Sequence, residues 1–234
     1  MYSFESRVRY SEVDANGRMT LESILDYFQD CSTFHSEDLG LGIAYLAERS
    51  LAWVLSSWQI DVVRYPVFGE KIKVATFPYD FKGFIGMRNF YIEDERGEKI
   101  AFANSIWTLM NLETERPNRL LPEMVEGYVL EEKLPMDYAP RKIAMPEGYE
   151  SQSPIEIKPY HLDTNHHVNN GQYLRIAMEY VEKDFTVRRM RAEYKKSALL
   201  GNQMIAKVAK EYGKYTISLC NEAEEVYAIV ELSR

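Results

Sequence analysis

A short motif occurs twice in this chain, as Asp14-Ala15-Asn16 and as Asp163-Thr164-Asn165, 149 positions apart. Each copy is followed by a stretch with helical periodicity. After the first copy, apolar residues recur at i, i+3, i+4, i+7 and i+10 between Leu21 and Cys31, which is the spacing of one buried helix face, and Thr20 opens the helix. The repeated motif therefore predicts two halves built alike, each around one helix.

Strand-like runs complete the first half. Residues favoured in strands lie between turns at Phe68-Gly69 and Arg96-Gly97, and they predict strands at 2–10, 51–63, 71–77, 86–94 and 99–112. In the second half, residues 192–201 align with 60–69 at an offset of 132, so this copy is 17 residues shorter between helix and strand. A repeat of about 130 residues is too long for a solenoid, and it predicts two copies of one α+β domain.

The boundary between the halves is marked by proline. Seven of the nine prolines lie between Pro117 and Pro159, a composition typical of a long connector. We therefore expect an N-terminal domain at 1–125, a connector at 126–152 and a C-terminal domain at 153–234.

Composition and charge exclude several classes. The longest uncharged apolar stretch, 100–112, has 13 residues, short of the roughly 20 that cross a bilayer. No signal peptide is recognisable, so a cytoplasmic location is expected. The net charge of −8 argues against a general nucleic-acid binder. Two cysteines cannot supply a disulfide framework, and we interpret Cys31 and Cys220 as buried thiols.

The most reactive side chains lie in the second motif and directly after it. Asp163, Asn165 and His167 combine a carboxylate, an amide and an imidazole within five residues. Asn169 or Asn170 is expected to cap the next helix, whose N-terminal N–H groups suit an oxyanion. These are the parts of a general-base site.

Other interpretations of this segment stay open. Three of the four histidines, His161, His166 and His167, fall within seven residues and with Asp163 can bind a metal, although one loop would then supply most of the ligands. A capped, solvated loop without chemistry is a further alternative. We expect His161 and His166 at the surface. The chain lacks the motifs of serine hydrolases, zincins, kinases and dehydrogenases.

The string Asp163-x-Asn165-x-His167-Val168-Asn169-Asn170, followed by Glu193-Tyr194-Lys195-Lys196, resembles the acyl-ACP thioesterases of plants and bacteria. The resemblance spans nearly the whole chain, including Tyr10 to Gly17. It implies an α+β protein of two tandem hotdog domains, each an antiparallel sheet wrapped around a long central helix. It also implies hydrolysis of the thioester between a fatty acyl chain and acyl carrier protein, without metal or other cofactor. The C-terminal domain would then be catalytic, and the N-terminal domain would shape the acyl pocket.

By this resemblance, Asp163, Asn165 and His167 match the catalytic Asp, Asn and His of the family. Plant members then place Glu and Cys where this chain has Ser197 and Ala198. A cysteine nucleophile is therefore not expected, and attack by water is favoured, with Ser197 positioning that water.

A basic segment is the expected docking surface for the acidic carrier. Residues 183–196 carry six basic and two acidic side chains, a net charge of +4 against −12 for the remainder. A solvated, charge-laced face is the alternative, because strand alternation would divide these side chains between two sides. The candidates are Arg188, Arg189, Arg191, Lys195 and Lys196.

Competing functions also stay open. They are a thioesterase for acyl-CoA or aryl-CoA, a hotdog dehydratase, and a non-catalytic protein that binds acyl groups or acyl carrier protein. A homodimer is left open too, since two hotdogs in one chain can already reproduce the usual dimer.

Overall fold

The computed structural model describes all residues from 1 to 234, in two compact units. The first comprises Met1–Ser56 and Ile60–Tyr138, and the second comprises Ser57–Gln59 and Ala139–Arg234. The last change of unit, between Tyr138 and Ala139, falls inside segment 126–152. We retain this segment as the proposed connector, with 1–125 and 153–234 as the proposed domains.

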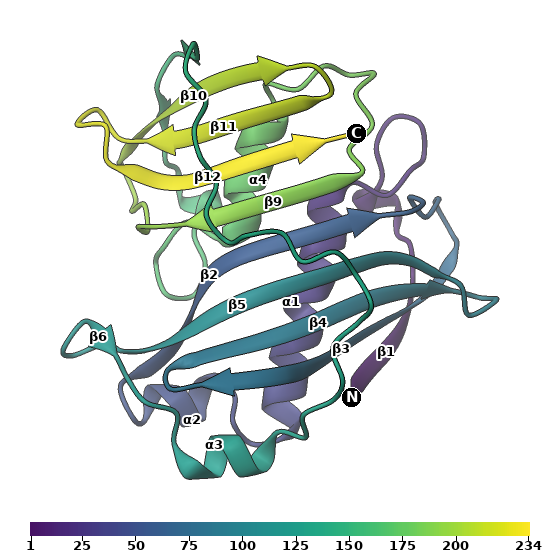
Figure 1. The fold of residues 1–234 in the computed structure, drawn as a ribbon, viewed down its shortest axis with the longest axis vertical. Helices are drawn as coiled ribbons and strands as arrows, with labels where there is room; N and C mark the ends of the chain where they lie inside the picture. Colours follow the sequence, from purple (N-terminus) through teal and green to yellow (C-terminus); the bar gives the residue numbers. More distant parts are fainter. The chain divides into compact units, whose positions relative to one another are not determined.

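The first unit is an antiparallel sheet with one long helix on its face (Figure 1). Its strands lie in the order β1-β3-β4-β5-β2, and the helix α1 contacts β1 and β3. The elements are β1 (Tyr2–Arg7), η1 (Tyr10–Glu12), α1 (Leu21–Asp38), α2 (Ile43–Ala47), β2 (Leu51–Val62), β3 (Lys71–Lys82), β4 (Ile85–Asp94), β5 (Lys99–Asn111), β6 (Arg116–Pro117) and α3 (Pro122–Gly127).

The second unit repeats this plan with a shorter helix, α4, against β11 and β12 (Figure 1). Its sheet order β7-β10-β11-β12-β9 corresponds strand for strand to that of the first unit, so the strand order of the two halves agrees as the repeat predicts. The elements are β7 (Glu150–Ser151), β8 (Ile155–Glu156), η2 (Pro159–His161), α4 (Asn170–Met178), β9 (Arg189–Tyr194), β10 (Gln203–Glu211), β11 (Lys214–Cys220) and β12 (Val226–Ser233).

Helix α1 forms where its periodicity predicts it. The hydroxyl of Thr20 caps it by accepting the N–H of Ser23 at 3.2 Å. Its apolar stripe is buried, Ile24 and Phe28 have no solvent exposure, and the Phe28 ring packs 5.3 Å from that of Phe90 on β4. Burying one such side chain contributes about 2 kcal/mol, so the stripe fixes which helix face meets the sheet.

Both cysteines are free and buried, as predicted. Burial raises the pKa of the Cys31 thiol to about 12, and it also raises the pKa of Cys220. Neither thiol is therefore a ready nucleophile, because the reactive form is the thiolate.

Three predicted boundaries were wrong. β1 ends at Arg7 rather than at 10, because the chain turns into the 3₁₀ helix η1 at Tyr10. β3 continues to Lys82 rather than stopping at 77, because a bulge between Pro78 and Asp80 accommodates the proline within the strand. The spacing of Tyr173, Ala177, Tyr180 and Val181 predicts a helical face that continues to Val181, whereas α4 ends at Met178. No helix has both the length and the apolar character needed to span a membrane.

Candidate active site

The predicted trio lies on a single tight turn at the start of α4. The backbone N–H of Asp163 donates to the carbonyl oxygen of His167 at 2.8 Å. In return, Oδ1 of Asp163 accepts the N–H of Asn165 at 2.8 Å and the N–H of His167 at 3.2 Å. One carboxylate oxygen thus folds the turn, and Oδ2 is left for substrate or water.

His166 occupies the strained position of this turn. Its φ of 60° lies in the left-handed region, which disfavours side chains other than Gly, Asn and Asp. Its side chain is exposed, as predicted. The left-handed backbone position of the turn is therefore occupied by His166, which is not one of the trio, whereas His167 is.

Helix α4 is capped at the residue after the turn. Of the two predicted caps the structure selects Asn169, whose Oδ1 accepts the N–H of Gly171 at 2.9 Å. A helix N-terminus carries positive partial charge, so this end of α4 suits a developing oxyanion beside the trio.

His161 corrects one expectation, because it is buried, with 6% exposure. Its Nδ1 accepts the N–H of Lys158 at 3.0 Å and so closes the 3₁₀ turn η2. Glu12 does the same for Arg9 in the first half, at 2.8 Å. Burial lowers the pKa of His161, which keeps the ring in its neutral, hydrogen-bond-accepting form.

The segment with Ser197 lies beside the turn. The N–H of Val168 donates to the carbonyl oxygen of Ala198 at 3.0 Å, and His167 forms a β-bridge with Leu199. The hydroxyl of Ser197 makes no hydrogen bond to His167. These two residues therefore do not form a hydrogen-bonded pair of nucleophile and base.

The same turn is built in the first half. Oδ1 of Asp14 accepts the N–H of Asn16 at 2.8 Å and the N–H of Arg18 at 3.0 Å, and Asp14 donates to the Arg18 carbonyl at 2.7 Å. Gly17, with φ of 71°, stands where the second half has His166, and Arg18 stands where it has His167. The backbone of the turn is therefore duplicated, whereas the imidazole is not.

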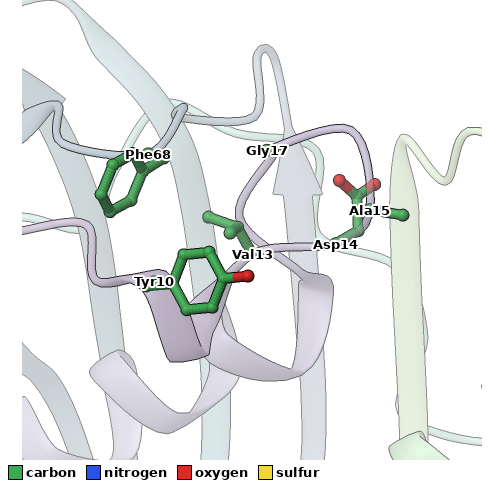
Figure 2. Close-up of a pocket in the computed structure, with 6 residues that line it drawn as sticks. All are labelled: Tyr10, Val13, Asp14, Ala15, Gly17 and Phe68. Carbon is green, nitrogen blue, oxygen red and sulfur yellow. The ribbon is translucent and has the colours of Figure 1, made fainter.

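A surface cavity of about 450 Å³ lies at this first copy (Figure 2). The rings of Tyr10 and Phe68 meet edge to face at 6.1 Å on one side of it. Its lining is Tyr10, Val13, Asp14, Ala15, Gly17 and Phe68. This cavity belongs to the copy without an imidazole, and none of the trio lines it.

One of the predicted docking residues, Arg191, is held by internal contacts. Arg191 points to the proposed connector, where its guanidinium donates to the carbonyls of Pro140 and Lys142 and pairs with Glu231 at 2.8 Å. Glu193 lies two residues further along β9, on the same sheet face, where it is buried and accepts the N–H of Ile143 at 3.0 Å. This pair holds the connector on one sheet face.

The other basic residues of 183–196 lie nearer solvent. Lys196 pairs with Glu225 at 2.7 Å, and Lys195 lies 3.9 Å from Glu193. Arg188 is exposed and Arg189 is half-buried. The segment therefore keeps an accessible basic part alongside the internal contacts of Arg191.

No three His, Cys, Asp or Glu side chains gather with the arrangement of a metal site. The clustered histidines of the sequence separate in space: His161 turns inward, whereas His166 and His167 are exposed.

Two domain models of one family match the chain in succession. Residues 1–128 match the acyl-ACP thioesterase N-terminal domain, and residues 146–228 match the acyl-ACP thioesterase C-terminal domain. The chain belongs to the acyl-ACP thioesterase family. Its structural neighbours in this family have the hotdog fold, so the predicted α+β tandem hotdog architecture is confirmed.

Relatives of known sequence or structure agree with this family. The acyl-[acyl-carrier-protein] hydrolase FATB3 of Cuphea viscosissima is 30% identical over 71% of this chain and 43% of its own length. An acyl-ACP thioesterase structure from Bacteroides thetaiotaomicron matches with a TM-score of 0.91 and 24% identity, over 99% of this chain and 96% of that one. A putative oleoyl thioesterase structure from Lactobacillus plantarum matches with a TM-score of 0.84 and 25% identity, over 99% and 94%. The chain spans about half the length of the curated relatives it matches.

Proposed function

We propose that this acyl-ACP thioesterase family member hydrolyses the thioester of fatty acyl-acyl carrier protein and releases a free fatty acid in the cytoplasm. The observation that carries the proposal is the placement of Asp163, Asn165 and His167 on one turn at the capped start of α4. Family membership supports the same reaction.

The reaction begins with water. Oδ2 of Asp163 takes a proton from a water molecule as its oxygen attacks the thioester carbonyl carbon, and the carbonyl oxygen becomes an oxyanion. The carbon–sulfur bond then breaks, the carbonyl re-forms, and the departing thiolate takes up the proton. A free thiol has a pKa of about 8.5, so the thiolate leaves with little help from an acid.

The other members of the site orient and stabilise. The amide of Asn165 and the N-terminus of α4 hold the carbonyl oxygen as charge develops on it. His167 shares the hydrogen-bond network of the water and the carboxylate. Ser197, exposed on the adjoining segment, positions the water. No step requires a metal or an organic cofactor.

We further propose that the carrier protein docks on the accessible basic part of 183–196, through Arg188, Arg189, Lys195 and Lys196. Arg191 serves the connector instead, because its guanidinium is held by Glu231 and by backbone carbonyls. Opposite charge would increase the encounter rate and make it sensitive to salt.

Charge reversal tests the docking surface. The double variant Arg188→Glu and Arg189→Glu should raise KM for acyl-ACP about tenfold or more and leave turnover of the matching acyl-CoA within twofold. Lys71→Glu, an exposed charge in the first unit, is the matched control. Equal KM for acyl-ACP in all three proteins would remove this surface from the account.

Thiol release tests the reaction. The purified chain should release carrier thiol from acyl-ACP of at least one chain length, measured across panels of acyl-ACP and acyl-CoA. Asp163→Ala should abolish this turnover, and undiminished turnover in that variant would refute the role of the carboxylate.

A further inference from the structure

We propose that Tyr173 is a positioning residue of this active site, holding the Ser197-Ala198 segment against the catalytic turn through one hydrogen bond. The inference rests on the proposed function. The Tyr173 hydroxyl accepts the backbone N–H of Ala198 at 2.9 Å.

This hydrogen bond closes a ring of contacts around the trio. Ala198 accepts the N–H of Val168 at 3.0 Å, and Val168 directly follows His167. Tyr173 itself stands in the first turns of α4, four residues after the cap Asn169. The turn, the helix start and the Ser197 segment are thus linked, and each sets the position of the other two.

The linking groups are buried. Ala198 has no exposure and Tyr173 has 2%. A buried N–H without a partner is destabilising, and the Tyr173 hydroxyl is the acceptor that satisfies the Ala198 N–H. The Tyr173 ring also meets the Tyr194 ring edge to face at 5.8 Å, and Tyr194 donates to the carbonyl of Asn170 at 3.2 Å.

The first half of the internal repeat lacks the hydrogen bond between Tyr173 and Ala198. At the offset of 149, Ile24 stands in the place of Tyr173, and at the offset of 132, Pro66 stands in the place of Ala198. Pro66 still accepts the N–H of Met19 at 2.8 Å, as Ala198 accepts that of Val168. The first half therefore keeps the backbone bond and lacks both partners of the side-chain bond.

Two conclusions follow from this comparison. The turn folds without the side-chain bond, because the first copy forms the same backbone contacts. Moreover, donor and acceptor are present together in the copy that has the imidazole, His167, and are missing together in the copy that has Arg18. We therefore assign the hydrogen bond to the proposed chemistry of the second copy, since the turn folds without it in the first.

Kinetics of matched variants test the inference. Tyr173→Phe removes the hydroxyl and keeps the ring, and it should lower kcat on acyl-ACP about tenfold or more with KM within twofold, since misplaced catalytic groups reduce turnover steeply. Ala198→Pro removes the N–H in a form that Pro66 shows the backbone accepts, and it should have the same effect. The double variant should be no slower than either single one.

The control is Tyr79→Phe, which removes a half-buried tyrosine hydrogen bond in the first unit, to Asn104 at 2.9 Å. It should keep kcat within twofold. A kcat of Tyr173→Phe equal to that of the control, or multiplied losses in the double variant, would overturn the positioning role.

Amide hydrogen exchange separates this inference from the proposed function. Tyr173→Phe should speed exchange at Ala198, His167 and Val168 relative to Tyr79→Phe, whether or not any thioester is hydrolysed. Unchanged protection at all three amides would overturn the inference even in an active enzyme. An inactive wild type with faster exchange in the variant would refute the function alone.

Discussion

The duplicated turn offers a matched pair of substitutions, Asp163→Asn and Asp14→Asn. In both copies the carboxylate Oδ1 accepts two backbone N–H groups, at 2.8 and 3.2 Å in the second and at 2.8 and 3.0 Å in the first. The amide oxygen of Asn can accept the same two hydrogen bonds. Each substitution should therefore cost less than about 1 kcal/mol of unfolding free energy, while removing one negative charge.

Catalysis should separate the two variants. Loss of a general base lowers turnover by about 10²–10⁴-fold. Asp163→Asn should therefore lower kcat on acyl-ACP by at least about 10²-fold. Asp14→Asn should keep wild-type kcat, because its copy has no imidazole. Replacement by Ala removes both hydrogen bonds and should destabilise each copy by about 2 kcal/mol, measured by urea unfolding.

The assay is thiol release under saturating substrate, with unfolding curves for all four variants. Equal kcat in Asp163→Asn and Asp14→Asn would refute the assignment of a base to the second copy. A large loss of stability in Asp163→Asn alone would show that charge rather than hydrogen bonding folds the turn.

Three further predictions concern stability and the rest of the loop. Burial and the Arg88 guanidinium, 2.6 Å from Nδ1, lower the pKa of His35 from 6.5 to about 4, so its neutral form stabilises the fold fully above pH 6.5 and this stabilisation is lost as pH falls towards 4. Between pH 7 and 5, wild type should thus lose about 2 kcal/mol more than His35→Gln in urea unfolding, and parallel curves would contradict this. His166→Gly relieves the positive φ and should raise stability by about 1 kcal/mol with kcat retained, whereas loss of kcat would place His166 in the chemistry. Asn169→Ala removes the cap of α4 and should cost about 1 kcal/mol, together with reduced kcat, and an unchanged melting temperature would refute the cap.

Much of the fold could be predicted from periodicity and turn residues. The helix stripe after Thr20, the turns at Gly69 and Gly97, and the repeat offsets of 149 and 132 all correspond to structural features. These signals are local, or compare one half of the chain with the other. Periodicity was less informative for boundaries, since the bulge after Pro78 depends on the neighbouring strand.

The turn that carries the proposed site could be predicted from the sequence, whereas its contacts could not. Asp163, Asn165 and His167 were proposed from the sequence because they lie within one short loop. The inward turn of His161 could have been inferred from Glu12, which fills the same position in the first half. The contact between Tyr173 and Ala198 joins residues 25 positions apart and has no signal in spacing. Arg191 likewise required knowledge of which sheet face the connector covers.

The most direct test of the central claim is product analysis with purified wild-type chain and fatty acyl-ACPs of different chain lengths, each tested separately. The account predicts equal amounts of free fatty acid and free carrier thiol, formed over many turnovers without added metal or cofactor. Absence of both products across all acyl chain lengths, with acyl-ACP still bound, would contradict it and favour a non-catalytic binding protein.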